Sequence, residues 1–415
     1  MIKTLVLTPT TVYPPMGGAP LRNWQHINIL SQFGPVGMFS IGIEEPPAHS
    51  PPQLAFWTHH TLDPNPPLTI QERLLRLTRP PRWWIYPYFH SLVTNEATAL
   101  LQQTIERFRP DVAILDRTHL HGYLPLLRSN AVPVIWDTHN VQSSLVREMN
   151  FALKGVSSSL LSQLALQRLR NLERGLSAQA AQVWVCSDED ARRLERVCGP
   201  SSDVRVIPNA IDIASYAWLR ESKRTETPGS GPHVFFVGVL SYEPNRVAVE
   251  FLLEKVYPML RSILPHARCT VAGRNPSHRM REAALRDSSI TLPGRVDDVR
   301  QYLAEADVVV VPLMQGGGTR LKILEAFAAG RPVVSTTKGN EGLRGIPGEH
   351  LLLADDPESI AAAIARLWFD ASLRESLTQA AYELVSQEYS WSAVSVRLRT
   401  AVEACIAEST CKLDG

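Results

Sequence analysis

The chain has 415 residues, which is long enough for two or three domains that each bury a core of their own. Its 42 basic and 41 acidic side chains leave a net charge of +1, so no whole-molecule field draws it to nucleic acid and any recognition of phosphate must be local. Its five cysteines form no Cys-x-x-Cys pair and have no metal-like spacing with histidine, which is typical of cytoplasmic thiols and predicts no metal site.

The amino-terminal stretch MIKTLVLTPT predicts a first β-strand at Lys3–Leu7. Its apolar run is too short for a secretory signal. No segment of the sequence reaches the ~18 apolar residues of a membrane span. We therefore expect a cytoplasmic protein.

A glycine-rich turn follows this strand. Gly17 and Gly18 lie in the segment PPMGGAPLR, which ends at Arg22 and opens a predicted helix. From the residues alone, an ordinary strand-to-helix turn and a ligand-binding turn explain this segment equally well.

The segment RLLRLTRPPRWWIYPYF, at Arg73–Phe89, repeats arginine every third residue and adds tryptophan and tyrosine. Basic and aromatic side chains together suit a bilayer interface, where cations meet anionic headgroups. A helix with a solvated basic face, followed by a core-packing turn, explains the same pattern. Peripheral contact with an anionic membrane, at its inner face, is therefore a hypothesis.

Short apolar runs alternate with helix-like segments, which indicates parallel sheets with helices on both faces. The runs form two series, Lys3–Leu7, Val36–Ile41, Val112–Leu115, Val134–Trp136 and Val183–Cys186, then His233–Val237, Arg268–Ala272, Ser289–Leu292, Val308–Val311 and Val333–Ser335. The polar stretch Glu221–His233 between them predicts an exposed connection. We predict an α/β protein of two doubly wound parallel-sheet domains facing across a cleft, in which ligands bind at the carboxyl ends of the strands.

His139 follows the apolar run at Val134–Trp136. Its imidazole is therefore expected just beyond the carboxyl end of a strand, where loop residues face the cleft. A lone histidine is more often structural than functional, so its position alone does not decide its role.

The segment Asp307–Leu343 combines a strand, a glycine-rich turn and a charged helix. The strand is the β-branched run at Val308–Val311. Gly316, Gly317 and Gly318 then let the backbone turn sharply and approach a ligand. The turn thus delivers bare amides to whatever binds there.

The helix after this turn is predicted over Arg320–Ala329, with Thr319 as its cap. Free amides, Arg320 and Lys322 make its amino terminus an anion site by dipole and by charge, and the obvious anion is phosphate. A solvated helix start is the alternative. The segment GGGTRLK does not have the spacing of a P-loop. Glu325 is an isolated acid on the same helix.

This segment resembles the carboxy-terminal nucleotide-binding motif of the family 4 glycosyltransferases, which are retaining enzymes with the GT-B fold. The resemblance lies in the order of the glycine-rich turn, Lys322-Ile323-Leu324-Glu325-Ala326, Gly330-Arg331-Pro332-Val333-Val334 and Glu341-Gly342-Leu343. It implies a Rossmann-like acceptor-binding domain at residues 1–210, a Rossmann-like nucleotide-sugar-binding domain at 211–390, and a last helix at 391–415 that joins the first domain.

The same resemblance implies roles for residues elsewhere in the chain. Gly17, Gly18 and Arg22 are expected near the donor phosphate and the acceptor. His139, in the segment DTHNVQSSLVREM, is expected to contact the transferred sugar. Further contacts to the nucleotide are expected at Gly238, Gly273, Gly294 and Val296.

The chain departs from the family pattern in two places. Many members hold the donor diphosphate with an arginine and a lysine at positions where this chain has Val239 and Pro244. The usual two glutamates separated by seven residues are reduced to Glu325, because Gly317 stands eight positions before it.

Other groups must then stabilise the leaving diphosphate, which requires cations or N–H donors aimed at the developing charge. By hypothesis, these are Arg320, Lys322 and the amides of Gly317, Gly318 and Thr319. Glu325 can accept hydrogen bonds from two ribose hydroxyls. A buried acid paired with a basic neighbour is the alternative for Glu325.

The sequence therefore predicts a retaining, metal-independent hexosyltransferase that moves a sugar from a nucleoside diphosphate sugar to a hydroxyl acceptor, either lipid-linked or part of a polysaccharide. The resemblance implies front-face substitution and no cofactor beyond the donor substrate. A scaffold that binds nucleotide sugars without turnover and a GT-B epimerase stay open as alternatives. A phosphorylase of the pyridoxal phosphate type would need a cofactor lysine that we cannot locate.

Overall fold

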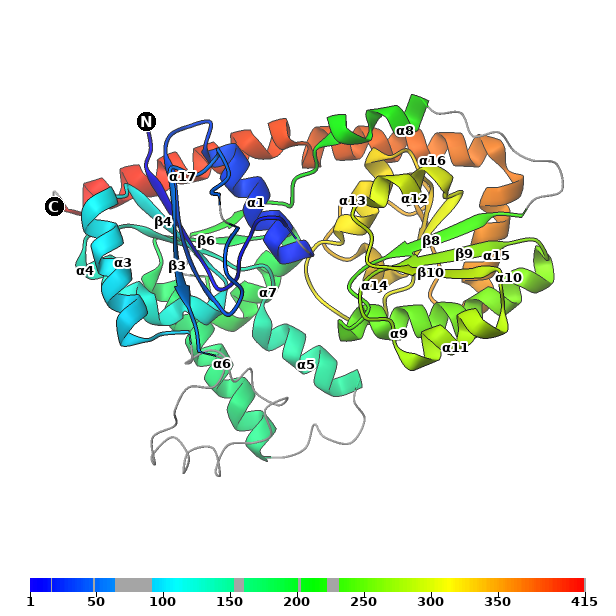
Figure 1. The fold of residues 1–415 in the computed structure, drawn as a ribbon, viewed down its shortest axis with the longest axis horizontal. Coiled ribbons are helices and arrows are strands. Elements are labelled where there is room, and N and C mark those ends of the chain that lie inside the picture. The colour runs from blue at the N-terminus through cyan, green and yellow to red at the C-terminus, as the bar shows by residue number, and fades with distance from the viewer. Residues whose placement is uncertain are drawn as a thin grey trace. The chain divides into compact units, whose positions relative to one another are not determined.

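The computed structural model describes residues 1–15, 17–47, 49–63, 92–152, 160–200, 203–221 and 231–413 (Figure 1). The chain divides into two compact units, Met1–Pro208 with Ser395–Gly415 and Asn209–Val394. The basic and aromatic stretch at Arg73–Phe89 lies outside the described residues, as does most of the predicted connection between the two series of strands.

The first unit contains a seven-stranded parallel sheet in the order β3-β2-β1-β4-β5-β6-β7. Its strands are β1 (Thr4–Thr8), β2 (Val36–Gly42), β3 (Phe56–Thr61), β4 (Val112–Asp116), β5 (Val134–Asp137), β6 (Gln182–Val185) and β7 (Val204–Val206). The five predicted runs of the first series all form strands. The edge strands β3 and β7 were not predicted, because their residues are only partly buried and their sequences are correspondingly polar.

The helices of this unit lie between successive strands, as the alternating pattern predicts (Figure 1). They are α1 (Gly18–Leu30), α3 (Asn95–Phe108), η1 (Thr118–Tyr123), α4 (Leu124–Ser129), α5 (Gln142–Ala152), α6 (Leu160–Gln179) and α7 (Asp188–Cys198). Side-chain caps start two of them, since Thr94 accepts from the amide of Ala97 and Ser187 from that of Asp190. The last helix, α17 (Trp391–Leu413), supplies the carboxy-terminal segment of the unit.

The second unit contains a six-stranded parallel sheet in the order β10-β9-β8-β11-β12-β13. Its strands are β8 (His233–Val237), β9 (Arg268–Ala272), β10 (Ile290–Gly294), β11 (Val308–Val311), β12 (Val333–Ser335) and β13 (Leu352–Leu353). The register places Val308 opposite Val234, so β8 and β11 are neighbours at the centre of the sheet. This strand order is that of a doubly wound Rossmann domain.

Helices precede, connect and follow these strands. They are η2 (Ile213–Tyr216), α8 (Ala217–Glu221), α9 (Glu243–Phe251), η3 (Leu252–Val256), α10 (Tyr257–Ile263), α11 (His278–Arg286), α12 (Val299–Glu305), α13 (Leu321–Ala328), α14 (Thr337–Asn340), α15 (Pro357–Phe369), α16 (Ala371–Leu384) and η4 (Val385–Tyr389). Within the described residues, no helix is both long and apolar enough to cross a bilayer.

The start of α13 corrects one prediction. The helix begins at Leu321, its N-cap position is Arg320, and no side chain caps it. Thr319 therefore does not act as the predicted cap. The chain enters helical geometry one residue later than expected, because the glycine turn extends as far as Arg320, whose side chain binds back onto that turn.

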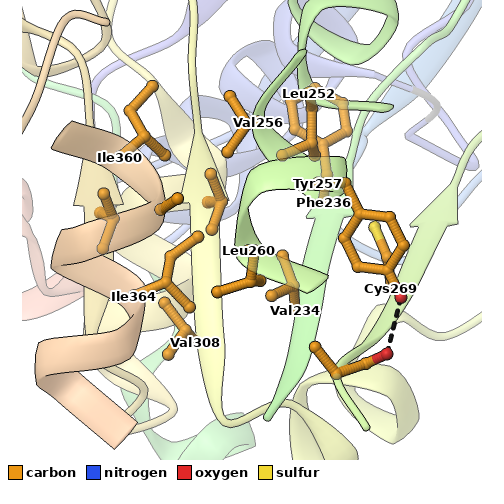
Figure 2. Packing of buried hydrophobic residues seen from close by; sticks show 14 of the residues in the cluster. Val234, Phe236, Leu252, Val256, Tyr257, Leu260, Cys269, Val308, Ile360 and Ile364 are labelled. Carbon is orange, nitrogen blue, oxygen red and sulfur yellow. Dashed lines mark hydrogen bonds between the residues drawn. The ribbon is translucent and has the colours of Figure 1, made fainter. Parts of the chain in front are cut away.

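Alternate residues of β8 pack into different apolar clusters, one on each face of the sheet. Val234 and Phe236 belong to the cluster under η3, α10 and α15, whereas Phe235 belongs to the cluster that includes residues of α13. Figure 2 shows Leu260 and Ile364 reaching toward the strand residues in the first cluster. Burial on both faces explains why this strand is a continuous apolar run.

We expect Leu260→Ala to destabilise the protein by about 2–5 kcal/mol, because a fully buried leucine loses its contacts and leaves a cavity. Ile263→Ala is the matched control on the same helix, where the side chain is 48% exposed, and it should cost less than about 1 kcal/mol. Urea unfolding followed by circular dichroism measures both values. Equal losses of unfolding free energy in the two variants would contradict the packing of Leu260 in this core.

Candidate functional site

The carboxyl ends of β8 and β11 mark the point where the strand order of the second sheet reverses. From β8 the chain continues to β9 and β10 on one side, and from β11 to β12 and β13 on the other. Ligands of open α/β sheets bind outside the carboxyl ends of the strands at such a point. Gly238 directly follows β8, and the glycine-rich turn at 316–318 follows β11.

Gly238 is the place where α13 approaches the end of β8. A Cβ at Gly238 would lie 2.9 Å from Nζ of Lys322 and 2.8 Å from Nδ2 of Asn245. Only glycine leaves room for both side chains without a shift. The predicted residues Gly238 and Lys322, 84 positions apart in the printed sequence, are therefore neighbours.

The ammonium group of Lys322 is held by neutral partners. Its Nζ donates to Oδ1 of Asn245 at 2.8 Å and lies 4.0 Å from the ring centroid of Phe236. Asn245 is fixed in turn, because its Nδ2 donates to the carbonyl of Val239 at 3.0 Å. Burial, assisted by the charge of Arg320, lowers the pKa of Lys322 to about 7.

Glu325 lies three residues further along α13. Its Oε1 accepts a hydrogen bond from the hydroxyl of Tyr216 at 3.2 Å. Burial raises the pKa of the Glu325 carboxyl to about 7, and the Tyr216 hydrogen bond and the charge of Lys322 oppose that rise. Helix α13 thus presents an amine and a carboxyl that both titrate near neutrality.

The guanidinium of Arg320 organises the glycine-rich turn. It donates to the carbonyl of Gly316 at 2.9 Å and to that of Lys338 at 3.4 Å, and it also donates to the carbonyls of Gly317 and Gly318. The residue is buried. These carbonyls are its partners in the free protein, and its contact with phosphate stays a prediction.

The turn itself needs glycine for its backbone angles and for its packing. Gly316 and Gly318 have φ values of 111° and 74°, which other residues rarely adopt. A Cβ at Gly316 would also lie 3.2 Å from Cβ of Pro244. Pro244, one of the two positions where many family members have a basic residue, thus packs against the turn.

Glycines also lie at the carboxyl ends of β9 and β10, the two strands on the other side of β8 from β11. The amide of Gly273, after β9, donates to the carbonyl of Gly294 at the end of β10, at 2.7 Å. A Cβ at Gly273 would lie 1.8 Å from the carbonyl oxygen of Gly238. Val296 is half-buried and packs against the apolar cluster nearby. The structure thus brings Gly238, Gly273 and Gly294 to one edge of the sheet.

In the first unit, Arg22 of α1 forms a buried ion pair at the end of β5. Its Nη2 lies 2.7 Å from Oδ1 of Asp137 and its Nε 3.2 Å from Oδ2, and both side chains are 1% exposed. Its Nη1 donates to the carbonyl of Ile207 at 2.8 Å. Burial alone would raise the pKa of Asp137, but the charge of Arg22 holds it well below its usual range.

His139 lies between two carboxylates. Its Nε2 is 3.1 Å from Oδ1 of Asp116, the last residue of β4, and 3.9 Å from Oδ2 of Asp137. Asn23 of α1 donates to the other oxygen of Asp116 at 2.7 Å. Burial would raise the pKa of Asp116, but the charges of Arg117 and His139 lower it to about 2. The imidazole thus lies just beyond the strand ends, where the sequence places it.

The glycine pair at the start of α1 takes a structural position. Gly17 is the N-cap, with φ 98°, and its carbonyl accepts from the amide of Leu21 at 3.1 Å. Gly18 is the first residue of the helix. Contacts of this pair with a ligand stay predictions.

Sequence reasoning missed three side chains that position the predicted residues. Asp116 could have been found, because it is a lone acid at the end of an apolar run. Asn245 and Tyr216 give no such signal, since they lie 77 and 109 residues from the side chains that they bind. Across the described ranges, no group of three or more His, Cys, Asp or Glu side chains could hold a metal ion.

Comparison with known proteins covers both units. A family model described as Glycosyltransferase Family 4 matches residues 55–215, and one described as Glycosyl transferases group 1 matches residues 231–370. A phosphatidyl-myo-inositol mannosyltransferase of Mycolicibacterium smegmatis is 30% identical over 209 residues, which are 49% of this chain and 52% of that protein. The chain spans about half the length of the curated relatives that it matches.

Solved structures resemble the chain along nearly its whole length. Sucrose-phosphate synthase from Thermosynechococcus elongatus has a TM-score of 0.74 and 18% identity, covering 98% of this chain and 100% of that one. HepE from Anabaena, solved with UDP and glucose, has a TM-score of 0.67 and 16% identity, covering 97% and 100%. These likenesses confirm the predicted GT-B fold class of two Rossmann-like, parallel-sheet domains.

We expect Arg22→Met to destabilise the protein by about 3–5 kcal/mol at pH 7, because it leaves the buried carboxylate of Asp137 without its cation. The low pKa of Asp137 contributes stability above the unfolded value of ~3.9, and this contribution is lost as the pH falls. The difference between wild type and variant should therefore shrink below pH ~4. Urea unfolding at several pH values measures it.

Arg192→Met is the matched control, because Arg192 is 63% exposed and pairs with Glu189 across one helical turn. Its removal should cost less than about 1 kcal/mol at any pH. A loss of that small size for Arg22→Met would show that Asp137 is not held by this ion pair.

Proposed function

Because the chain belongs to the family 4 glycosyltransferases, we propose that it moves a hexose from a nucleoside diphosphate sugar to a hydroxyl group of a glycolipid or polysaccharide acceptor, with retention and without a metal ion. The observation that carries the proposal is the ammonium of Lys322 beside Gly238, at the switch point of the second sheet. The name of the mycobacterial relative supports a hexose and a lipid-linked acceptor.

In this proposal, Lys322 replaces the basic pair that many family members carry after β8. Val239 and Pro244 provide no positive charge there, and the lysine brings one to the same strand end from α13. A diphosphate near the amine would raise its pKa, so that the protonated form is the one that binds. The ammonium then lies where negative charge develops on the leaving group.

The glycine-rich turn and Glu325 are proposed to hold two neighbouring parts of the same nucleotide, the diphosphate and the ribose. The amides of Gly317, Gly318 and Thr319 are the N–H donors proposed for the diphosphate, and Arg320 keeps their turn in shape through its carbonyl contacts. Glu325 in its ionised form accepts hydrogen bonds from the ribose hydroxyls. The base is proposed to lie against Gly273, Gly294 and Val296.

The reaction that follows is a front-face substitution at the anomeric carbon. The bond from this carbon to the diphosphate oxygen breaks, and the bond to the acceptor oxygen forms on the same face of the sugar. The leaving diphosphate takes the proton of the acceptor hydroxyl. His139, whose Nε2 lies 3.1 Å from Oδ1 of Asp116, is proposed to contact the transferred sugar. Arg22, which pairs with Asp137, is proposed to hold the end of β5.

We expect Lys322→Ala to reduce kcat by about 100- to 1000-fold, because the leaving diphosphate loses its cation. Lys255→Ala is the matched control, since it removes an exposed lysine of the same unit, and its activity should stay normal. Release of nucleotide and transfer to lipid-linked and saccharide acceptors are measured with UDP-, GDP- and ADP-sugars, beginning with UDP-glucose.

A near-normal kcat in Lys322→Ala would show that this lysine does not stabilise the leaving diphosphate. Donor binding by the wild type without any release of nucleotide would favour the scaffold alternative. The same screen identifies the donor base and the sugar.

We also expect a narrow, bell-shaped dependence of kcat/KM on pH, with a maximum near 7. Below about 7 Glu325 becomes protonated and loses its capacity to accept two hydroxyl groups, and above about 7 Lys322 loses its charge in the free protein. Lys322→Arg should flatten the alkaline limb, because arginine stays protonated. An alkaline limb that is unchanged in this variant would mean that another group titrates there.

A further inference from the structure

We propose that Tyr216 is a positioning residue that fixes the carboxylate of Glu325 for the ribose of the donor, and that it thereby makes the protein select ribonucleotides over 2′-deoxyribonucleotides. This inference rests on the proposed function, because it deepens the role of Glu325 in the nucleotide site. Tyr216 belongs to none of the motifs that identify the family resemblance.

Tyr216 is held rigidly at the start of the second unit. Its side chain is 8% exposed and belongs to the apolar cluster that includes Leu219 and Phe327. The backbone just before it is fixed as well, because the carbonyl of Ser215 accepts from Nη1 of Arg300 at 3.2 Å. A hydroxyl on a ring that is packed in the core gives the flexible carboxylate a donor at a defined position.

The hydroxyl of Tyr216 engages one of the two oxygens of Glu325, at 3.2 Å. A glutamate side chain has three rotatable bonds, so a single fixed donor removes much of its freedom before any ligand binds. A carboxylate offers about four lone-pair sites, of which the tyrosine uses one. The remaining sites can accept both hydroxyls of a ribose, whereas a 2′-deoxyribose supplies one hydroxyl fewer.

The same hydrogen bond favours the ionised form of Glu325. Burial raises the pKa of this carboxyl, whereas the Tyr216 hydroxyl and the charge of Lys322 lower it. Asp298, the N-cap of α12, and Arg300, in the first turn of that helix, also act on Tyr216 through their charges. Loss of the hydroxyl should therefore move the acid limb of the pH profile to higher pH.

The test is Tyr216→Phe, which keeps the packing of the ring and removes only the hydroxyl. The probes are UDP, GDP and ADP, each compared with its 2′-deoxy form by titration calorimetry. We expect the variant to bind the preferred ribonucleotide about tenfold more weakly, while its affinity for the 2′-deoxy form changes much less. The acid limb of kcat/KM should move upward in the same variant.

Tyr257→Phe is the matched control. Its hydroxyl lies at the edge of the core shown in Figure 2 and donates to the carbonyl of Ala267 at 2.7 Å. This change also removes a buried tyrosine hydroxyl from the second unit. It should leave unaltered both the preference for ribonucleotides over 2′-deoxyribonucleotides and the dependence of kcat/KM on pH.

The outcomes separate the two proposals. If the wild type binds none of the nucleotides, the proposed function is wrong and this inference with it. If the wild type prefers ribonucleotides and Tyr216→Phe keeps the full preference and the same acid limb, the inference alone is overturned. A lower melting temperature in Tyr216→Phe with an unchanged preference overturns it as well, because the hydroxyl then serves stability only.

Discussion

The candidate site at the carboxyl ends of the strands of the second sheet depends on one close approach, between the ammonium group of Lys322 and the backbone of Gly238. Lys322 reaches the end of β8 only because Gly238 has no Cβ, which would lie 2.9 Å from the ammonium nitrogen. The approach is possible because β8 and β11 are adjacent, so the helix that follows β11 starts beside the turn that follows β8. Neighbouring strand ends thus allow residues from distant parts of the chain to share one site.

The buried charged side chains of the two units have different kinds of partner. In the first unit, Arg22 and Asp137 are both buried and form an ion pair with each other. Each charge is therefore neutralised by the other, and the pair holds the strand end. In the second unit, the partners of Lys322 and Glu325 are a neutral amide and a neutral hydroxyl. Neutral partners orient the charged groups without cancelling their charge, and burial brings the pKa of each group to about 7.

The sequence predicted the central strands because burial on both faces requires continuous apolar runs, as in Val308–Val311. It missed the edge strand at Phe56–Thr61, whose residues are only partly buried and include two histidines. Gly238, Lys322 and Glu325 were predicted through their motifs, and the structure brings Gly238 and Lys322 together. Asn245 and Tyr216 were not predicted, because each contacts a side chain far away in the sequence and no local pattern indicates such a contact. The charge of Arg320 also did not show that its side chain turns back onto the glycine-rich turn.

The segment after β8 has uncharged side chains at Val239 and Pro244, and Lys322 brings an amine to this strand end from α13. Pro244 packs against Gly316, so it supports the glycine-rich turn. Asn245, the next residue, accepts the hydrogen bond of Lys322. Gly238, Asn245 and the ring of Phe236 are thus arranged around a lysine that comes from another helix. The basic group at this strand end thus belongs to a residue 84 positions further along the chain than Gly238, and the fold rather than the local sequence brings the two together.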